Sequence, residues 1–214
     1  DLDSLTMGYL FSEGVIRNQG DIESIHVDRS KGVAWVETEC KRRLAKDFSF
    51  RRIITTGCGR GASLLRKAGE PDIRKISSHL ILSATDISAL VKEFQRKSQM
   101  HKLTGGVHSA AVCEKNRIVF FCEDIGRHNA IDKVIGKCLM NGISLTNLAL
   151  ITSGRVSSEI AIKVARSGIP LLISKSAPTD MGIRVAKTLG LTIVGFARGQ
   201  RMNVYSNSKR VRQH

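Results

Sequence analysis

The chain has 214 residues, of which 42% are hydrophobic and 25% are charged, as expected for an ordinary globular protein of one or two domains. No apolar run approaches the ~20 residues that a membrane-spanning helix needs, so the sequence argues against an integral membrane protein, and we expect no membrane partner. The five cysteines are widely spaced and odd in number, which favours a reducing, cytoplasmic environment over a disulfide framework.

The chain is also strongly basic. Its 34 lysines and arginines against 19 aspartates and glutamates give a net charge of +15 and a pI near 10.1, which predicts an anionic partner. We expect no nucleic-acid partner, because aromatic residues make up only 5% of the chain and no recognisable DNA- or RNA-binding module is present. The charge therefore indicates a nucleotide, a phosphorylated cofactor or an acidic protein surface.

The first 78 residues are expected to form a small N-terminal α+β domain that contains a cysteine loop. An amphipathic helix and two short strands are indicated by apolar spacing, at residues 5–13, 22–27 and 32–37. Residues 54–78 carry four glycines and one proline, which is typical of a connector.

Residues 79–214 alternate between strand and helix patterns with short links. This alternation predicts an α/β domain with a mostly parallel sheet flanked by helices. The predicted strands are residues 109–113, 117–122, 148–151, 171–174 and 192–197. The predicted helices are residues 83–97, 129–140, 157–166 and 179–189.

Polar and glycine-containing runs follow several of these predicted strands. Ligands of such sheets bind outside the carboxyl ends of the strands, and three of the runs also open helices, whose N–H groups and positive dipole ends attract anions. Any one run could be an ordinary cap or turn, but their coincidence on one edge favours a binding site. The candidate binding residues are His108, Asp124, Arg127, His128, Ser153, Gly154, Arg155, Ser176, Ala177, Pro178, Thr179, Phe196, Ala197, Arg198, Gly199, Gln200 and Arg201.

Structural roles remain open for some of these residues. His108 and His128 each follow a polar or glycine-rich turn and could be hydrogen-bonded structural histidines. Asp124, Arg127 and Asp132 could form an internal ion-pair network at the start of the predicted 129–140 helix, as is common beside ligand crevices.

Zinc chemistry is disfavoured by the sequence. The zinc deaminases need H-x-E and P-C-x-x-C, whereas His108 is followed by Ser109 and Ala110, and no C-x-x-C occurs in the chain. We therefore predict no zinc and no metal site. The cysteines in the predicted strands and helices fit core positions, namely Cys113, Cys122 and Cys138.

Cys58 has different surroundings. It stands in the run T-T-G-C-G-R-G at residues 55–61, where glycines leave the sulfur little cover. From these residues alone it could be a structural thiol, half of a metal site or a nucleophile. Arg51, Arg52 and Arg60 lie close in sequence and would lower the pKa of the thiol, which favours the reactive thiolate.

Taken together, these motifs resemble the formate dehydrogenase accessory sulfurtransferases, the FdhD/NarQ family. The resemblance covers nearly the whole chain, and the run D-I-G-R-H-N at residues 124–129 is highly specific. The other motifs are M-G-Y-L-F-S-E-G at residues 7–14, the loop at Cys58, T-G-G-V-H-S-A at 104–110, S-G-R-V-S-S-E at 153–159, S-A-P-T at 176–179 and G-F-A-R-G-Q-R-M-N-V-Y at 195–205.

The resemblance implies a cytoplasmic homodimer that takes persulfide sulfur from a cysteine desulfurase and passes it to a cofactor that formate dehydrogenase needs. That cofactor is the molybdenum (or tungsten) bis(molybdopterin guanine dinucleotide), which GDP would mimic as a fragment. Cys58 would be the catalytic residue that carries the persulfide, and residues 196–201 would bind the cofactor. The implied fold is a cytidine-deaminase-like α/β domain without zinc, joined to a smaller domain.

Two departures from the family pattern bear on the mechanism. The family loop is usually C-G-x-C-G, whereas Gly61 and Ala62 stand at the last two positions here, so Cys58 would act alone or with a thiol of its partner. The family also has several dozen residues before the first helix, so an N-terminally incomplete chain is expected. The main alternative function is a non-catalytic chaperone that binds and protects the molybdenum cofactor during insertion.

Overall fold

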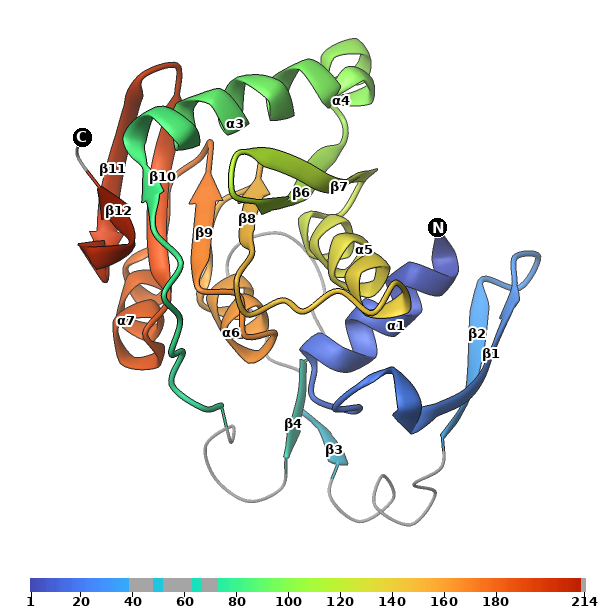
Figure 1. Cartoon of the computed structure of the whole chain (residues 1–214). Coiled ribbons are helices and arrows are strands. Elements are labelled where there is room, and N and C mark those ends of the chain that lie inside the picture. The colour runs from blue at the N-terminus through green and yellow to red at the C-terminus, as the bar shows by residue number, and fades with distance from the viewer. Residues whose placement is uncertain (39–47, 52–62, 67–72, 213–214) are drawn as a thin grey trace.

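A computed structural model of the chain describes residues 1–38, 48–51, 63–66 and 73–212 (Figure 1). Among these residues, no helix is both long and apolar enough to cross a membrane. The centre of the molecule is a six-stranded sheet that has helices on both faces (Figure 1).

The N-terminal part begins with helix α1 (Leu2–Ser12). An antiparallel hairpin of β1 (Ile22–Asp28) and β2 (Val33–Thr38) follows, after a single turn of 3₁₀ helix. Two further strands, β3 (Phe48–Arg51) and β4 (Ser63–Arg66), pair with each other in antiparallel orientation. Because β4 lies inside residues 54–78, the segment predicted as a connector contains regular structure.

The main sheet has the strand order β11-β10-β9-β8-β6-β7. Its strands are β6 (His108–Glu114), β7 (Arg117–Asp124), β8 (Ala149–Thr152), β9 (Leu171–Ser174), β10 (Thr192–Arg198) and β11 (Arg201–Ser206). The pairs β8–β9 and β9–β10 are parallel, whereas β6–β7, β6–β8 and β10–β11 are antiparallel.

The α/β class is therefore confirmed, but the expectation of mostly parallel pairing needs correction. The two outer pairs are hairpins with very short turns, and such turns join only antiparallel strands. Lys115 and Gly199 occupy these turns with positive φ angles of 52° and 57°. Only the three central strands, β8, β9 and β10, are linked by crossover helices and run parallel.

The helices of this larger part are α3 (Ala84–Lys97), α4 (Gln99–Thr104), α5 (Arg127–Met140), α6 (Ser158–Arg166) and α7 (Asp180–Leu189). Several of these helices begin at the polar residues from which their start was predicted. The hydroxyl of Ser83 accepts the N–H of Asp86 in a capping box, Ser157 accepts the N–H of Ile160, and Thr179 caps α7. A short parallel pair, β5 (Leu82–Ser83) and β12 (Val211–Arg212), lies beside the sheet.

The core is divided by the sheet into two apolar clusters. Residues that pack with α5, α6 and α7 include Val112, Leu150, Leu172 and Ile193. Residues that pack with α3 include Ala111, Ile151, Ile173 and Val194. Because alternate residues of a strand point to opposite faces, strands covered on both sides need continuous apolar runs, as these sequences have.

Helix α1 packs directly on α5. A Cβ atom at Gly8 would collide with the backbone carbonyl of Asp132, and one at Gly136 would collide with that of Ser4. Glycine at these two positions lets the two helix backbones touch. The N-terminal helix is thus fixed against the helix that begins with the candidate residues Arg127 and His128 (Figure 1).

Candidate functional site

Three of the candidate runs, residues 153–155, 176–179 and 196–201, lie at the carboxyl ends of β8, β9 and β10, which the parallel pairing brings together. Three backbone hydrogen bonds join the runs that follow these strands: Lys175 N–H to Thr152 O (3.1 Å), Val156 N–H to Ala177 O (3.1 Å) and Phe196 N–H to Ser176 O (3.1 Å). An isolated parallel bridge between Val156 and Pro178 adds a further link. Residues 153–155, 176–179 and 196–201 therefore form one continuous edge.

The run after β8 is fixed to β6. Ser153 Oγ accepts the N–H of Ser109 at 2.9 Å and lies 3.3 Å from His108 Nδ1. A Cβ at Gly154 would lie 3.0 Å from the Cβ of Arg127 and 3.5 Å from His108 Nδ1. The absence of a side chain at Gly154 thus allows His108 and Arg127 to meet at this point of the edge.

Positive charge converges on His108. Burial lowers the pKa of His108, and the neighbouring charges of Arg127, His101 and Arg155 lower it further. The imidazole is therefore neutral at pH 7 and can accept or donate a hydrogen bond. The positive groups around it form an environment that favours an anion.

The start of α5 is organised by Asp124. Its Oδ1 accepts the N–H of Gly126 (2.9 Å) and the amide of Asn129 (3.0 Å), and its Oδ2 pairs with Lys133 at 2.5 Å. Burial raises the pKa of Asp124, but these hydrogen bonds outweigh it, and the net shift is downward. Asp124 thus has the structural role left open by the sequence, and both its oxygens are already engaged.

His128 lies one step along α5 from Arg127. Its Nε2 is 3.4 Å from Glu159 Oε2 without making a hydrogen bond to it. Burial lowers the pKa of His128 to about 4, with further contributions from the positive charges of Arg127 and Lys163. The ring is therefore neutral at pH 7, and its contact with Glu159 is not an ion pair.

A buried polar cluster lies next to His128, where α1, α5 and α6 meet. Lys163 Nζ donates to Ser12 Oγ (2.7 Å), Glu13 Oε1 (3.0 Å) and Asp132 Oδ1 (2.9 Å), and Ser12 Oγ also donates to Asp132 Oδ1. Lys163 and Asp132 are only 4% and 1% exposed. Asp132 is thus paired in this cluster and Asp124 pairs separately with Lys133, so the two aspartates do not share an ion pair.

The outer rim of the edge is formed by the end of β10. Phe196 has φ of +51°, which is unusual for a residue other than glycine, and its side chain is 43% exposed. Arg198 Nε donates to the backbone carbonyl of Lys175 at 3.1 Å. Burial lowers the pKa of Lys175, followed by the charges of Arg198 and Lys102, so cations also gather at this rim.

Two residues of this edge were missed by the sequence prediction. Lys175 lies within the polar run that follows β9, and its position between Ser174 and Ser176 was a usable signal. His101 lies on the unpredicted helix α4, and its Nδ1 is 2.6 Å from the carbonyl of Val107, next to His108. A six-residue helix gives too little periodicity to predict such a contact.

The described cysteines are core residues, as the sequence predicted. Cys113, Cys122 and Cys138 are free and buried. Burial raises the pKa of all three thiols, that of Cys138 to about 12. They are therefore protonated at pH 7 and shielded from partners. Cys58 and its loop lie outside the described residues.

A metal site needs several ligand side chains close together. In the part of the chain that the structure describes, no group of three or more His, Cys, Asp or Glu residues is placed to hold a metal ion. The acidic and imidazole groups near the edge are separated into the Asp124, His108 and His128 neighbourhoods described above.

Comparison with known proteins gives consistent results. The FdhD/NarQ family model matches residues 1–212. The sulfur carrier protein FdhD of Bacillus subtilis (strain 168) is 37% identical over 212 residues, which cover 99% of this chain and 81% of that protein. The sulfur carrier protein FdhD of Listeria innocua is 38% identical over 212 residues, which cover 98% and 81%. A solved chain from Desulfotalea psychrophila, assigned as a formate dehydrogenase accessory protein, matches with a TM-score of 0.77 and 27% identity over 99% of this chain and 80% of that one.

Proposed function

This chain belongs to the FdhD/NarQ family, and we propose that it is a cytoplasmic sulfur carrier that serves formate dehydrogenase. The names of the curated relatives support sulfur transport, and the assignment of the Desulfotalea chain supports the link to formate dehydrogenase. Both similarities extend over almost the whole chain, so they include the sheet edge described above.

In this proposal Cys58 carries the sulfur. The Cys58 thiolate attacks the terminal sulfur of a persulfide on a cysteine desulfurase, the thiolate of the desulfurase leaves, and Cys58 becomes the persulfide. The three described cysteines favour this assignment by contrast, because each is buried and has a raised pKa. Cys40 also lies outside the described residues, so a Cys40→Ser variant is the natural control for Cys58→Ser.

The acceptor in this proposal is the molybdenum or tungsten bis(molybdopterin guanine dinucleotide) cofactor, treated as the substrate. The observation that carries this part is the joining of residues 153–155, 176–179 and 196–201 into one edge that exposes Arg155, Arg198 and Arg201. Pyrophosphate groups bind to arginine in a bidentate manner. The exposed ring of Phe196 offers a flat apolar surface for a guanine or pterin ring.

A homodimer would place two such edges near the two nucleotide arms of one cofactor. The rim at Phe196 and Arg198 is exposed, so it is accessible to a large ligand. Sedimentation of the chain with and without GDP tests this arrangement, and a monomer under both conditions would contradict it.

The decisive experiment is mass spectrometry of the chain after incubation with a cysteine desulfurase and cysteine. We expect added sulfur on the peptide that contains Cys58, and we expect it to disappear in Cys58→Ser but to remain in Cys40→Ser. Sulfur on Cys40 alone, or on neither cysteine, would contradict the proposed carrier residue.

Activation of formate dehydrogenase separates transfer from chaperoning. Cys58→Ala should leave GDP binding at the edge intact and abolish activation, because a carrier needs its thiol. A variant that activates the enzyme fully would favour the chaperone, which needs only the binding edge.

A further inference from the structure

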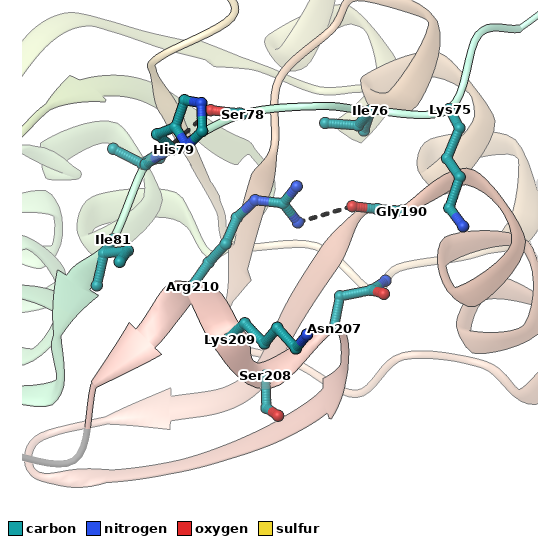
Figure 2. Close-up of a pocket in the computed structure, with 11 residues that line it drawn as sticks. Lys75, Ile76, Ser78, His79, Ile81, Gly190, Asn207, Ser208, Lys209 and Arg210 are labelled. Atoms are coloured by element: carbon teal, nitrogen blue, oxygen red, sulfur yellow. Dashed lines mark hydrogen bonds between the residues drawn. The ribbon is translucent and has the colours of Figure 1, made fainter.

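A pocket lies near the beginning of β10, at the end of this strand opposite the candidate site. It has a volume of about 630 Å³ and is bounded by the extended segment of residues 75–81 and by residues 207–210 (Figure 2). The N–H of Ile76 donates to Leu189 O at 2.8 Å, and Gly190 lines the pocket just before β10 begins. Since the candidate site lies at the carboxyl end of β10, the two sites are at opposite ends of this strand.

The lining of this pocket combines basic and apolar residues. Among the described residues that line it, four carry basic groups and none carries a carboxylate. The basic residues are Lys75, His79, Lys209 and Arg210, and the apolar residues are Ile76, Leu80 and Ile81. Lys75 and Lys209 form no ion pair with any described residue. Because unpaired cations in one concavity repel each other, an anion bound between them would be favoured.

Arg210 presents part of its guanidinium group to the pocket. Its Nη1 donates to Gly190 O at 2.7 Å (Figure 2). It also donates to Thr192 Oγ1 at 3.1 Å, and the two bonds fix the plane of the group. Its Nε is buried and has no hydrogen-bond partner, and Nη2 donates to no described residue. Because Nε is closed off from solvent, Nη2 is the donor of this group that remains for a phosphate in the pocket.

A concave surface lined by lysine and arginine without a carboxylate attracts an anion. We propose that this pocket binds a small phosphate ester of about nucleotide size, with its phosphate held by Arg210, Lys209 and Lys75. A volume of about 630 Å³ exceeds the need of a free phosphate ion and lies in the range of small-molecule sites, ~300–1,000 Å³. The apolar wall of Ile76 and Leu80 would cover the organic part of the ligand.

The test is calorimetric titration of the full chain with AMP at low and high salt. We expect a saturable AMP site at this pocket, and we expect Lys75→Gln combined with Lys209→Gln to weaken it at least tenfold. These two side chains are exposed and form no described hydrogen bond, so the double variant should fold normally. Lys92→Gln, an exposed lysine on α3, is the matched control and should bind AMP like the unmodified chain.

The binding of AMP to a second variant locates the ligand, and the binding of inorganic phosphate and adenosine defines its class. Binding at the pocket should survive Arg198→Ala, which removes a cation only from the opposite edge, and should protect residues 75–81 and 207–210 from hydrogen exchange. Inorganic phosphate should bind more weakly than AMP, and adenosine should not bind. AMP binding that is lost in Arg198→Ala but retained in the double lysine variant would overturn the proposal, as would the absence of AMP binding. Because the pocket and the candidate site respond to different substitutions, the proposed sulfur carrier function can fail without affecting this result.

Discussion

Lys163 and Asp132 form a buried ion pair in which Lys163 Nζ lies 2.9 Å from Asp132 Oδ1 and 3.1 Å from Asp132 Oδ2. The pair joins α6 to α5, and hydrogen bonds of Lys163 to Ser12 and Glu13 extend it to the end of α1. The pair is close enough to His128 for the charge of Lys163 to contribute to the lowered pKa of that histidine. This cluster therefore connects the N-terminal helix with the candidate site.

Replacing Lys163 with methionine should destabilise the fold strongly. Removal of one partner leaves Asp132 buried without a counter-ion, which typically costs about 3–5 kcal/mol. Urea unfolding of Lys163→Met measures this loss, with Lys92→Met on the exposed face of α3 as the control. Lys163→Met combined with Asp132→Leu should lose less, because both charges are gone. A single variant as stable as the control would show that the ion pair contributes little.

Stability should fall with acid because of His128. Burial and the charges of Arg127 and Lys163 lower its pKa to about 4, whereas an unfolded histidine titrates near ~6.5. The unfolded chain thus binds the proton more readily, so the stabilisation is complete above pH ~6.5 and is lost as the pH falls toward 4. Since one pKa unit corresponds to ~1.4 kcal/mol, the contribution is at most about 3.5 kcal/mol.

His128→Gln removes the titrating group and should flatten the dependence of unfolding free energy on pH between 7 and 4.5. His108 also has a lowered pKa, so part of the slope should remain in this variant. Parallel stability curves for the variant and the unmodified chain would contradict the neutral state of His128.

Much of the fold could be predicted from local sequence, because local residues cause it. Ser83, Ser157 and Thr179 cap the helices that they predicted, and in the larger part each predicted boundary agrees with the structure to within about two residues. Strand β11 (Arg201–Ser206) was not predicted, although R-M-N-V-Y-S alternates; of its residues only Arg201 was assigned, to the candidate binding run. The pairing directions also depend on which strands are neighbours in space, and local patterns do not encode this.

The candidate edge was predicted by a topological rule, whereas its internal contacts were not. The rule places residues after parallel strands at one edge, and the hydrogen bonds between the runs after β8, β9 and β10 agree with it. Lys163 was not predicted as buried, since a lysine on an amphipathic helix usually faces solvent. Its burial depends on Asp132 and Glu13, which come from two other helices far away in sequence.

Gly154 is predicted to control the contact between His108 and Arg127. In Gly154→Ala the new Cβ would lie 3.0 Å from Arg127 Cβ, so one of the two backbones must shift. We expect a loss of about 1–3 kcal/mol in stability, as for overpacked sites, together with weaker GDP binding. Gly106→Ala is the matched control, because its nearest neighbour, Thr104 Oγ1, is 3.8 Å away. Equal thermal stability and GDP affinity in the two variants would refute this role.

The binding edge should prefer guanine nucleotides, and its affinity should depend on Arg198. If the guanine dinucleotide cofactor is the substrate, GDP should bind more tightly than ADP, and the binding of both nucleotides should weaken with salt because phosphate contacts are screened.

Arg198 is held by the carbonyl of Lys175 and remains exposed, so it can contact a phosphate at the rim of the edge. Arg198→Ala should cost roughly 1.5–3 kcal/mol of GDP binding, the range for hydrogen bonds to charged groups. Calorimetry with both nucleotides measures this, with Arg117→Ala as the control, because Arg117 pairs with Glu114 at the β6–β7 turn, at the end of β7 opposite to Asp124. Since charge cannot distinguish GDP from ADP, equal affinities would remove the support for guanine recognition, whereas an unchanged affinity in Arg198→Ala would place the phosphates elsewhere.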